Sequence, residues 1–185
     1  MKRLIIFNIC ILSLVSCEKV WYEELNERAN DTIRGIYQPV SIIWEESEPI
    51  DINGDGEASF DYLAEWENVW YGSPGDSSAS DGRGTLAIPY IIDGDADDKD
   101  SPWYSPWLAQ RHIPYEFQYK VVIEGNESHL EFVLPKDGSE FCHTGHGEIT
   151  LRTEVTLTTL TQEGTTKDVT GTIFIKYART QYLGN

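Results

Sequence analysis

The sequence predicts a mainly β protein, built as an antiparallel meander that closes into a barrel or, as the alternative, packs as a two-sheet sandwich. Apolar and polar residues alternate over the C-terminal half, short turns join the alternating runs, and no helical pattern separates them. Strands joined in this way pair with their neighbours and do not form βαβ units. Such a sheet must bury its apolar face by curling on itself or by packing on a second sheet.

The composition supports a folded core and excludes one class of function. The chain has 185 residues, of which 40% are hydrophobic and 12% aromatic, enough for one packed domain. It carries 14 Lys plus Arg against 31 Asp plus Glu, a formal charge of −17. A nucleic-acid binder that relies on phosphate contacts needs a basic face, so we expect no nucleic-acid partner.

Residues 1–16 have the features of a secretory signal peptide. Lys2 and Arg3 precede an apolar run that ends at Val15, well short of the roughly 20 residues that span a bilayer. The residues up to Cys17 (Leu-Val-Ser-Cys) resemble a bacterial lipobox, which implies cleavage before Cys17 and lipid attachment to its sulfur. The alternative is an ordinary signal peptide with an incidental cysteine.

The lipobox resemblance also implies a location. Glu18 is not the aspartate associated with inner-membrane retention, which favours an outer-membrane lipoprotein facing the periplasm or the cell surface. A chain this acidic has no basic patch for a membrane, so the membrane contact must come from lipid on Cys17. Cys10 leaves with the signal and Cys17 is acylated, which leaves Cys142 without a partner for an intrachain disulfide.

Residues 17–34 are predicted to be a lipidated tether with a short amphipathic helix. Glu24 and Arg28 form an i,i+4 pair, and Gly35 stands where a helix C′ residue belongs. The apolar residues have helical spacing at Tyr22, Leu25, Ala29 and Ile33.

Residues 35–185 form the predicted β domain. Its first strand starts at Gly35, and Pro39 indicates either an edge strand or a bend in the strand. Residues 72–84 are too polar and too rich in glycine to pack, which predicts a loop. The residues expected to face the core are Ile36, Val40, Ile42 and Trp44 in the first strand, and Leu86, Ile88, Tyr90 and Ile92 in a later one.

The C-terminal half is predicted to form two hairpins. The turn at 125–128 joins the first pair of strands, and the turn at 161–166 joins the second pair. The inward residues of the first hairpin are Tyr115, Phe117, Tyr119, Val121, Ile123, Leu130, Phe132 and Leu134. Those of the second are Ile149, Leu151, Val155, Leu157, Val169, Gly171, Ile173, Ile175 and Tyr177.

The segment 51–61 resembles half of a calcium-binding EF-hand or dockerin loop. Oxygen ligands stand at positions 1, 3, 5, 7 and 9, supplied by Asp51, Asn53, Asp55, the Glu57 carbonyl and Ser59. Gly56 allows the turn at position 6. Position 12 departs from the pattern because Tyr62 replaces the acidic ligand, and Asp61 comes one residue early, which predicts weak Ca²⁺ affinity.

The alternative for this segment is an Asx-rich turn that caps the following short helix. That helix is expected to place Phe60, Leu63, Trp66 and Trp70 on one side. A second acidic stretch, residues 93–100, lacks the glycine at position 6 and is interpreted as an exposed loop in preference to a cation site.

Two further segments offer side chains for a site. Trp103, Tyr104 and Trp107 stand between prolines and are suited to stacking on a sugar ring, unless they fold back on the end of the barrel. Cys142, His143 and His146 occur together, but without matching partners they are interpreted as a turn and not as a zinc site. The catalytic signatures of serine hydrolases, P-loop proteins and zincins are absent from the sequence.

The combination of lipobox, helix, GIYQPVSI opening and DINGDGEASFDYL segment resembles small lipocalin-like lipoproteins of the Gram-negative envelope. This resemblance implies a β-barrel or half-barrel with an internal cavity and carries over no catalytic residue; Tyr37 stands in place of the usual tryptophan. We therefore expect a non-enzymatic, lipid-anchored module that binds a small apolar or glycan ligand or an envelope partner. The alternatives are a calcium-stabilised interaction module and an envelope glycan hydrolase, which would need a pair of carboxylates.

Overall fold

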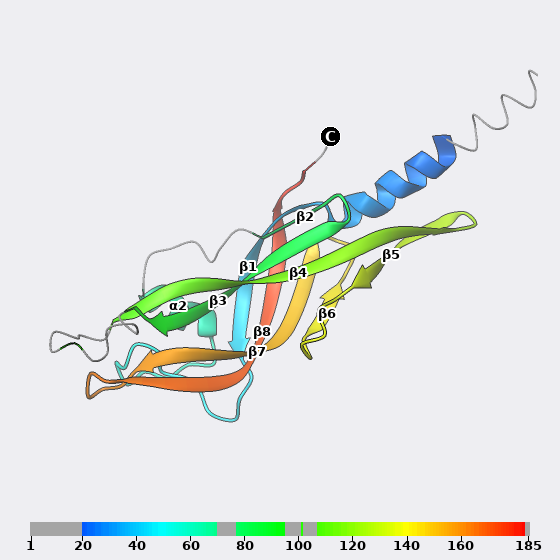
Figure 1. Cartoon of the computed structure of the whole chain (residues 1–185). Coiled ribbons are helices and arrows are strands. Elements are labelled where there is room, and N and C mark those ends of the chain that lie inside the picture. The colour runs from blue at the N-terminus through cyan, green and yellow to red at the C-terminus, as the bar shows by residue number, and fades with distance from the viewer. Residues whose placement is uncertain (1–19, 70–76, 95–100, 102–106, 184–185) are drawn as a thin grey trace, which may run out of the picture.

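The computed structural model describes residues 20–69, 77–94, 101 and 107–183. Eight strands form one antiparallel sheet, which curls into a half-barrel (Figure 1) and confirms the predicted mainly β fold. A helix over residues 20–33 precedes the sheet. The other elements are β1 (Gly35–Trp44), α2 (Tyr62–Val69), β2 (Ser77–Ser80), β3 (Arg83–Asp93), β4 (Leu108–Glu124), β5 (Glu127–Val133), β6 (Glu140–His143), β7 (Glu148–Leu160) and β8 (Thr166–Gln181).

The strand order is β5-β4-β3-β2-β1-β8-β7-β6, so β1 pairs with β8 and the sheet is open between β5 and β6. This is the order of an eight-stranded up-and-down barrel with one seam left unpaired. Aromatic rings meet inside the seam: the Phe132 and Phe141 centroids lie 5.1 Å apart, and those of Phe117 and Phe141 lie 4.9 Å apart. Side chains, and not backbone hydrogen bonds, thus close this side of the curl.

The C-terminal hairpin β7–β8 has the register and the inward face that the alternation predicts. Leu160 pairs with Thr166 at the turn, and the pairing continues without a break to Glu148 and Ala178. The buried residues of its inner face are Ile149, Leu151, Val155, Leu157, Ile173, Ile175 and Tyr177. In the hairpin β4–β5 the residues beyond Gln118 pair only with β5, so Val121 and Ile123 are half-buried.

The first strand corrects the predicted inner face. Ile42 and Trp44 are buried, but Val40 is 52% exposed and Ile36 is half-buried. The pairing of β1 with β8 shifts between Pro39 and Ser41, which makes Val40 an extra, bulged residue. Side chains before the bulge therefore have the opposite phase, and Tyr37 faces the core.

The end of β3 also departs from its predicted face. Leu86 and Ile88 are buried as predicted, but Tyr90 and Ile92 are half-buried, and Ile91 between them is fully buried.

Part of the predicted loop 72–84 is a strand. Ser77–Ser80 pairs with β1 on one side and β3 on the other. Ser77 is fully buried, and its hydroxyl Oγ accepts a hydrogen bond of 2.8 Å from the Ala87 N–H. A polar side chain packs here because its oxygen has a backbone partner.

The two helices largely follow their predicted patterns. In the N-terminal helix Leu25, Ala29 and Ile33 are buried, whereas Tyr22 is 45% exposed. Tyr62 and Trp66 of α2 are fully buried and Leu63 is half-buried, but Phe60 lies outside the helix and is 45% exposed; Trp70 lies outside the described residues. Figure 1 shows the N-terminal helix and α2 at opposite ends of the curled sheet, which we call the helix end and the α2 end.

Candidate functional site

Trp107 lies at the α2 end, just before β4. The Gly94 N–H donates a hydrogen bond of 2.7 Å to the Trp107 carbonyl, which closes the end of the β3–β4 ladder. A Cβ at position 94 would overlap the Trp107 ring, so only glycine lets the indole lie there. Trp107 is nevertheless 45% exposed. One part of the ring is supported by backbone, and the rest is open to solvent.

The other two predicted stacking residues, Trp103 and Tyr104, lie outside the described residues, as does Cys17. Of the second acidic stretch, the structure describes Asp93, which is buried and accepts a hydrogen bond of 3.3 Å from the Thr166 hydroxyl. Residues 95–100 lie outside the described part of the chain.

The 51–59 loop lies beside α2 and is folded by hydrogen bonds from its own backbone. Asp51 accepts bonds of 2.8 Å from the N–H groups of Gly54 and Gly56. The Asn53 side chain accepts from the Asp55 N–H, and Asp55 accepts from the Glu57 N–H. These Asx turns agree with both interpretations of the sequence. A loop that wraps a cation and a plain Asx-rich turn have the same backbone shape.

Ser59 and Asp61 start the helix α2. The Ser59 hydroxyl accepts a bond of 3.0 Å from the Asp61 N–H, and the Asp61 carboxylate accepts one of 3.2 Å from the Ala64 N–H. Asp61 is therefore the N-cap of α2. Tyr62, at the twelfth loop position, is fully buried and donates its hydroxyl hydrogen to the Pro89 carbonyl.

Glu65 is a buried carboxylate that the sequence pattern did not reveal. It is 5% exposed, and its Oε2 accepts a hydrogen bond of 3.2 Å from the Ile52 N–H. Burial raises the pKa of Glu65, the hydrogen bond from Ile52 opposes that rise, and the charges of Asp55, Asp51 and Glu57 raise the pKa further. The sequence does show Glu65 as an acidic residue in the first turn of α2. It stands three positions after Tyr62, the twelfth position of the calcium-loop pattern.

The described residues contain no group of three or more His, Cys, Asp or Glu arranged to hold a metal ion. Cys142 is exposed, and His143 instead contacts the N-terminal helix, with Nε2 3.1 Å from the Thr32 carbonyl. The predicted turn is wrong for Cys142 and His143, which lie in β6, and their side chains point to opposite faces because neighbouring positions alternate along a strand.

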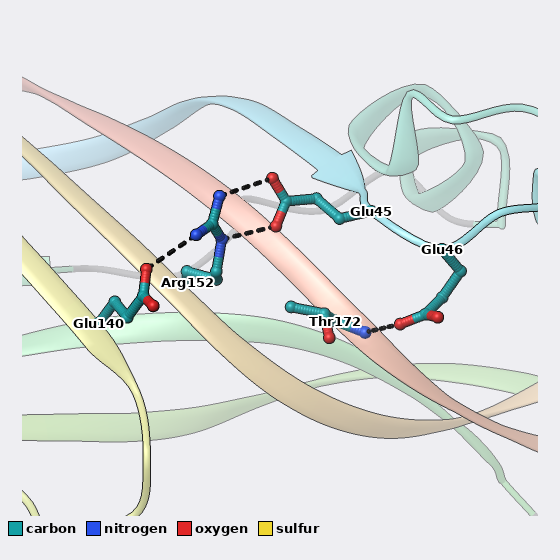
Figure 2. Close-up of polar contacts among 5 residues, drawn as sticks. All are labelled: Glu45, Glu46, Glu140, Arg152 and Thr172. Atoms are coloured by element: carbon teal, nitrogen blue, oxygen red, sulfur yellow. Dashed lines mark hydrogen bonds and ion pairs between the residues drawn. The ribbon is translucent and has the colours of Figure 1, made fainter.

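Two carboxylates meet on the outer face of the sheet at Arg152 of β7. Its guanidinium donates to both oxygens of Glu45, at 2.7 and 3.2 Å, and to Glu140 at 2.8 Å (Figure 2). Nearby, Glu46 accepts a bond of 2.7 Å from the Thr172 N–H (Figure 2). Glu45 and Glu140 thus share one cation, an arrangement that ties the loop after β1 to β7 and β6.

Open grooves lie over the sheet surface. The larger, of about 640 Å³, is formed by β3, β4 and the end of β5, and includes Arg83, Glu116 and Gln118. A second, of about 400 Å³, lies beside the loop after β1 and includes Glu46, Glu48 and Lys167. Neither groove contains Glu45 or Glu140.

Comparisons of the chain with protein-family models, curated proteins and solved structures found no match in any of the three. Over the described residues, the helices are all too short or too polar to cross a bilayer.

Proposed function

We propose that this chain is a non-catalytic binding module of the cell envelope, held at the outer membrane by lipid on Cys17, and that it binds a glycan at Trp107. The observation that carries this proposal is the half-exposed indole supported by Gly94. A rigid aromatic plane with one open side offers the apolar face of a sugar ring a large contact at little cost in conformational entropy.

The packed inner face favours a surface ligand over an apolar ligand inside the curl. The described core runs from the α2 end to the helix end through large side chains, among them Trp66, Ile175 and Tyr37, each fully buried. The lipocalin-like resemblance remains a prediction, and the half-barrel is compatible with it. Glycan binding at the surface requires no internal cavity.

Titration with the trisaccharide of N-acetylglucosamine, followed by calorimetry, tests the proposal. Trp107→Ala is expected to weaken binding about tenfold, because loss of a stacked ring costs on the order of 1 kcal/mol. Trp107→Phe keeps an aromatic plane and is expected to retain part of the affinity. Trp21→Ala, at the helix end, is the matched control and should leave the affinity unchanged.

Two outcomes would contradict the proposal. Equal affinities of the wild type and Trp107→Ala would remove the stacking site. Cleavage of the trisaccharide would instead support the hydrolase alternative, in which a carboxylate pair carries acid–base chemistry.

A second candidate is a calcium-stabilised interaction module, and the observation that favours it is the concentration of negative charge around Glu65. The carboxylates of Asp51, Asp55 and Glu57 all raise the pKa of this buried group. A divalent cation in the loop would offset that repulsion. This candidate is compatible with a glycan at Trp107, because the loop and the indole are separate features of the α2 end.

Thermal unfolding in Ca²⁺ and in EDTA tests the calcium candidate. For an extracellular-type site, about 10 mM Ca²⁺ should raise the Tm by roughly 5 °C. Asp51→Asn should abolish the rise, whereas Asp61→Asn should preserve it because asparagine also caps helices. Coincident curves for the wild type would end this candidate.

A further inference from the structure

The C-terminal two-thirds of the N-terminal helix is packed on the half-barrel. Leu25, Ala29 and Ile33 are 8%, 5% and 0% exposed. The Ser128 hydroxyl of β5 donates a hydrogen bond of 3.0 Å to the Leu25 carbonyl. This face of the helix therefore belongs to the core of the molecule.

The last turn of the helix is held by two other strands. The Arg179 guanidinium of β8 donates to the carbonyls of Asp31 and Arg34, at 2.8 and 3.2 Å. The His143 Nε2 of β6 lies 3.1 Å from the Thr32 carbonyl. These groups satisfy carbonyls that a helix C-terminus leaves without partners. Contacts from β5, β6 and β8 together fix the direction of the helix.

The first turn of the same helix contains three apolar or aromatic residues, Val20, Trp21 and Tyr22, followed by Glu23; Trp21 is half-buried. Val20 is 60% exposed and Tyr22 is 45% exposed. Trp21 packs edge-on against Tyr22, with ring centroids 5.4 Å apart and an angle of 69° between the planes. Figure 1 shows this end of the helix projecting away from the sheet. The exposed apolar residues are thus carried at the far end of a rigid arm.

Cys17 precedes Val20 by three residues. A chain spans at most about 3.5 Å per residue, so the Val20 Cα lies within roughly 10 Å of the Cys17 Cα. With lipid on that cysteine, Val20, Trp21 and Tyr22 are held close to the bilayer surface. Tryptophan and tyrosine are the residues that favour the membrane interface, because their rings are apolar with one polar atom.

We propose that Val20, Trp21 and Tyr22 form an interfacial contact with the lipid bilayer and that the clamped helix directs the α2 end, with Trp107, away from the membrane. The inference rests on the proposed lipid anchor at Cys17. Glu23, Glu24 and Glu27 follow the contact along the helix, and their charges are expected to weaken it on anionic lipid.

Quenching by brominated phosphatidylcholine tests the contact and the orientation together. The lipidated mature protein is placed in phosphatidylcholine vesicles, with and without brominated lipid, and tryptophan emission is recorded. Trp21→Phe should remove most of the bromine-dependent loss of emission. Trp107→Phe, the matched control at the opposite end, should leave that loss unchanged.

The contact is overturned if brominated lipid quenches no emission, or if Trp21→Phe leaves the quenching intact. Loss of quenching in Trp107→Phe would overturn the orientation. The mass of the Cys17 peptide reports separately on the anchor. If Cys17 carries no lipid, coupling of this thiol to a maleimide lipid in a Cys142→Ser chain still tests the contact, so failure of the anchor and failure of the contact are distinguishable.

Discussion

His143 couples the docking of the N-terminal helix to pH. For its ring to donate to the Thr32 carbonyl, Nε2 must carry the hydrogen. Burial lowers the pKa of His143 below its ordinary value of 6.5, and the charges of Arg179 and His146 lower it further, against the hydrogen bond to Thr32. As pH falls below about 6.5 the unfolded chain binds this proton first, so the folded state loses stability until the lowered folded pKa is reached.

His143→Gln is expected to reduce this pH dependence, because the glutamine amide N–H replaces the donor without titrating. Urea unfolding at several pH values between about 5 and 7.5 measures the effect, and the difference between variant and wild type removes the contribution of the other titrating groups. Parallel stability curves for the two proteins would contradict the assignment to His143.

Gly84 shows how closely the seam aromatics approach the sheet. A Cβ at this position would overlap the Phe117 ring, which packs on the bare backbone. Gly84→Ala is expected to lower the free energy of unfolding by about 1–3 kcal/mol, the usual cost of overpacking a core. The double variant Gly84→Ala with Phe117→Leu should show a smaller loss than the sum of the single variants. Strict additivity in denaturant unfolding would refute the contact.

At the scale of elements, Arg179 fastens the N-terminal helix to β8. Arg179→Gln removes the charged donor to the carbonyls of Asp31 and Arg34, so amide hydrogen exchange over residues 20–33 should become faster. Exchange in β7 and in the rest of β8 should stay slow. Arg111→Gln is the control, since Arg111 donates only to the carbonyl of its neighbour Gln110 in the described structure. Unchanged helix exchange in Arg179→Gln would show that apolar packing alone holds the helix.

Elements with long, regular alternation were predictable from the sequence, and interrupted ones were not. The hairpin β7–β8 pairs without a break, and most of its inner face was predicted correctly; Val169 is half-buried. A single bulged residue, Val40, reverses the phase of β1, and only the pairing with β8 reveals it. The short strand Ser77–Ser80 has no apolar pattern, because its burial depends on partners in β1 and β3.

The polar contacts also divide into those that the sequence predicted and those that it did not. The Asx turns of Asp51 and Asn53 are local, so residue spacing predicted the loop shape. The bridge between Arg152 and Glu45 joins residues 107 positions apart and depends on which strands are neighbours. Glu65 does not occupy a ligand position of the calcium-loop pattern. Its proximity to the loop depends on how α2 packs.

At the scale of the whole molecule, the two ends of the half-barrel have different chemistry. The helix end carries exposed apolar residues in the first turn of the clamped helix. The α2 end carries the Asx-turn loop, the buried Glu65 and the open indole of Trp107. One connected hydrophobic core lies between these ends and fixes their relation. The proposed membrane contact and the proposed glycan site therefore lie at opposite ends of the half-barrel.

The most direct test of the glycan site is a two-dimensional ¹H–¹⁵N NMR titration of the mature protein with the N-acetylglucosamine trisaccharide. We expect the largest shifts at the Trp107 indole N–H and the Gly94 amide, with the N-terminal helix unaffected. Shifts confined to the groove around Arg83, or no shifts at saturating sugar, would contradict the site.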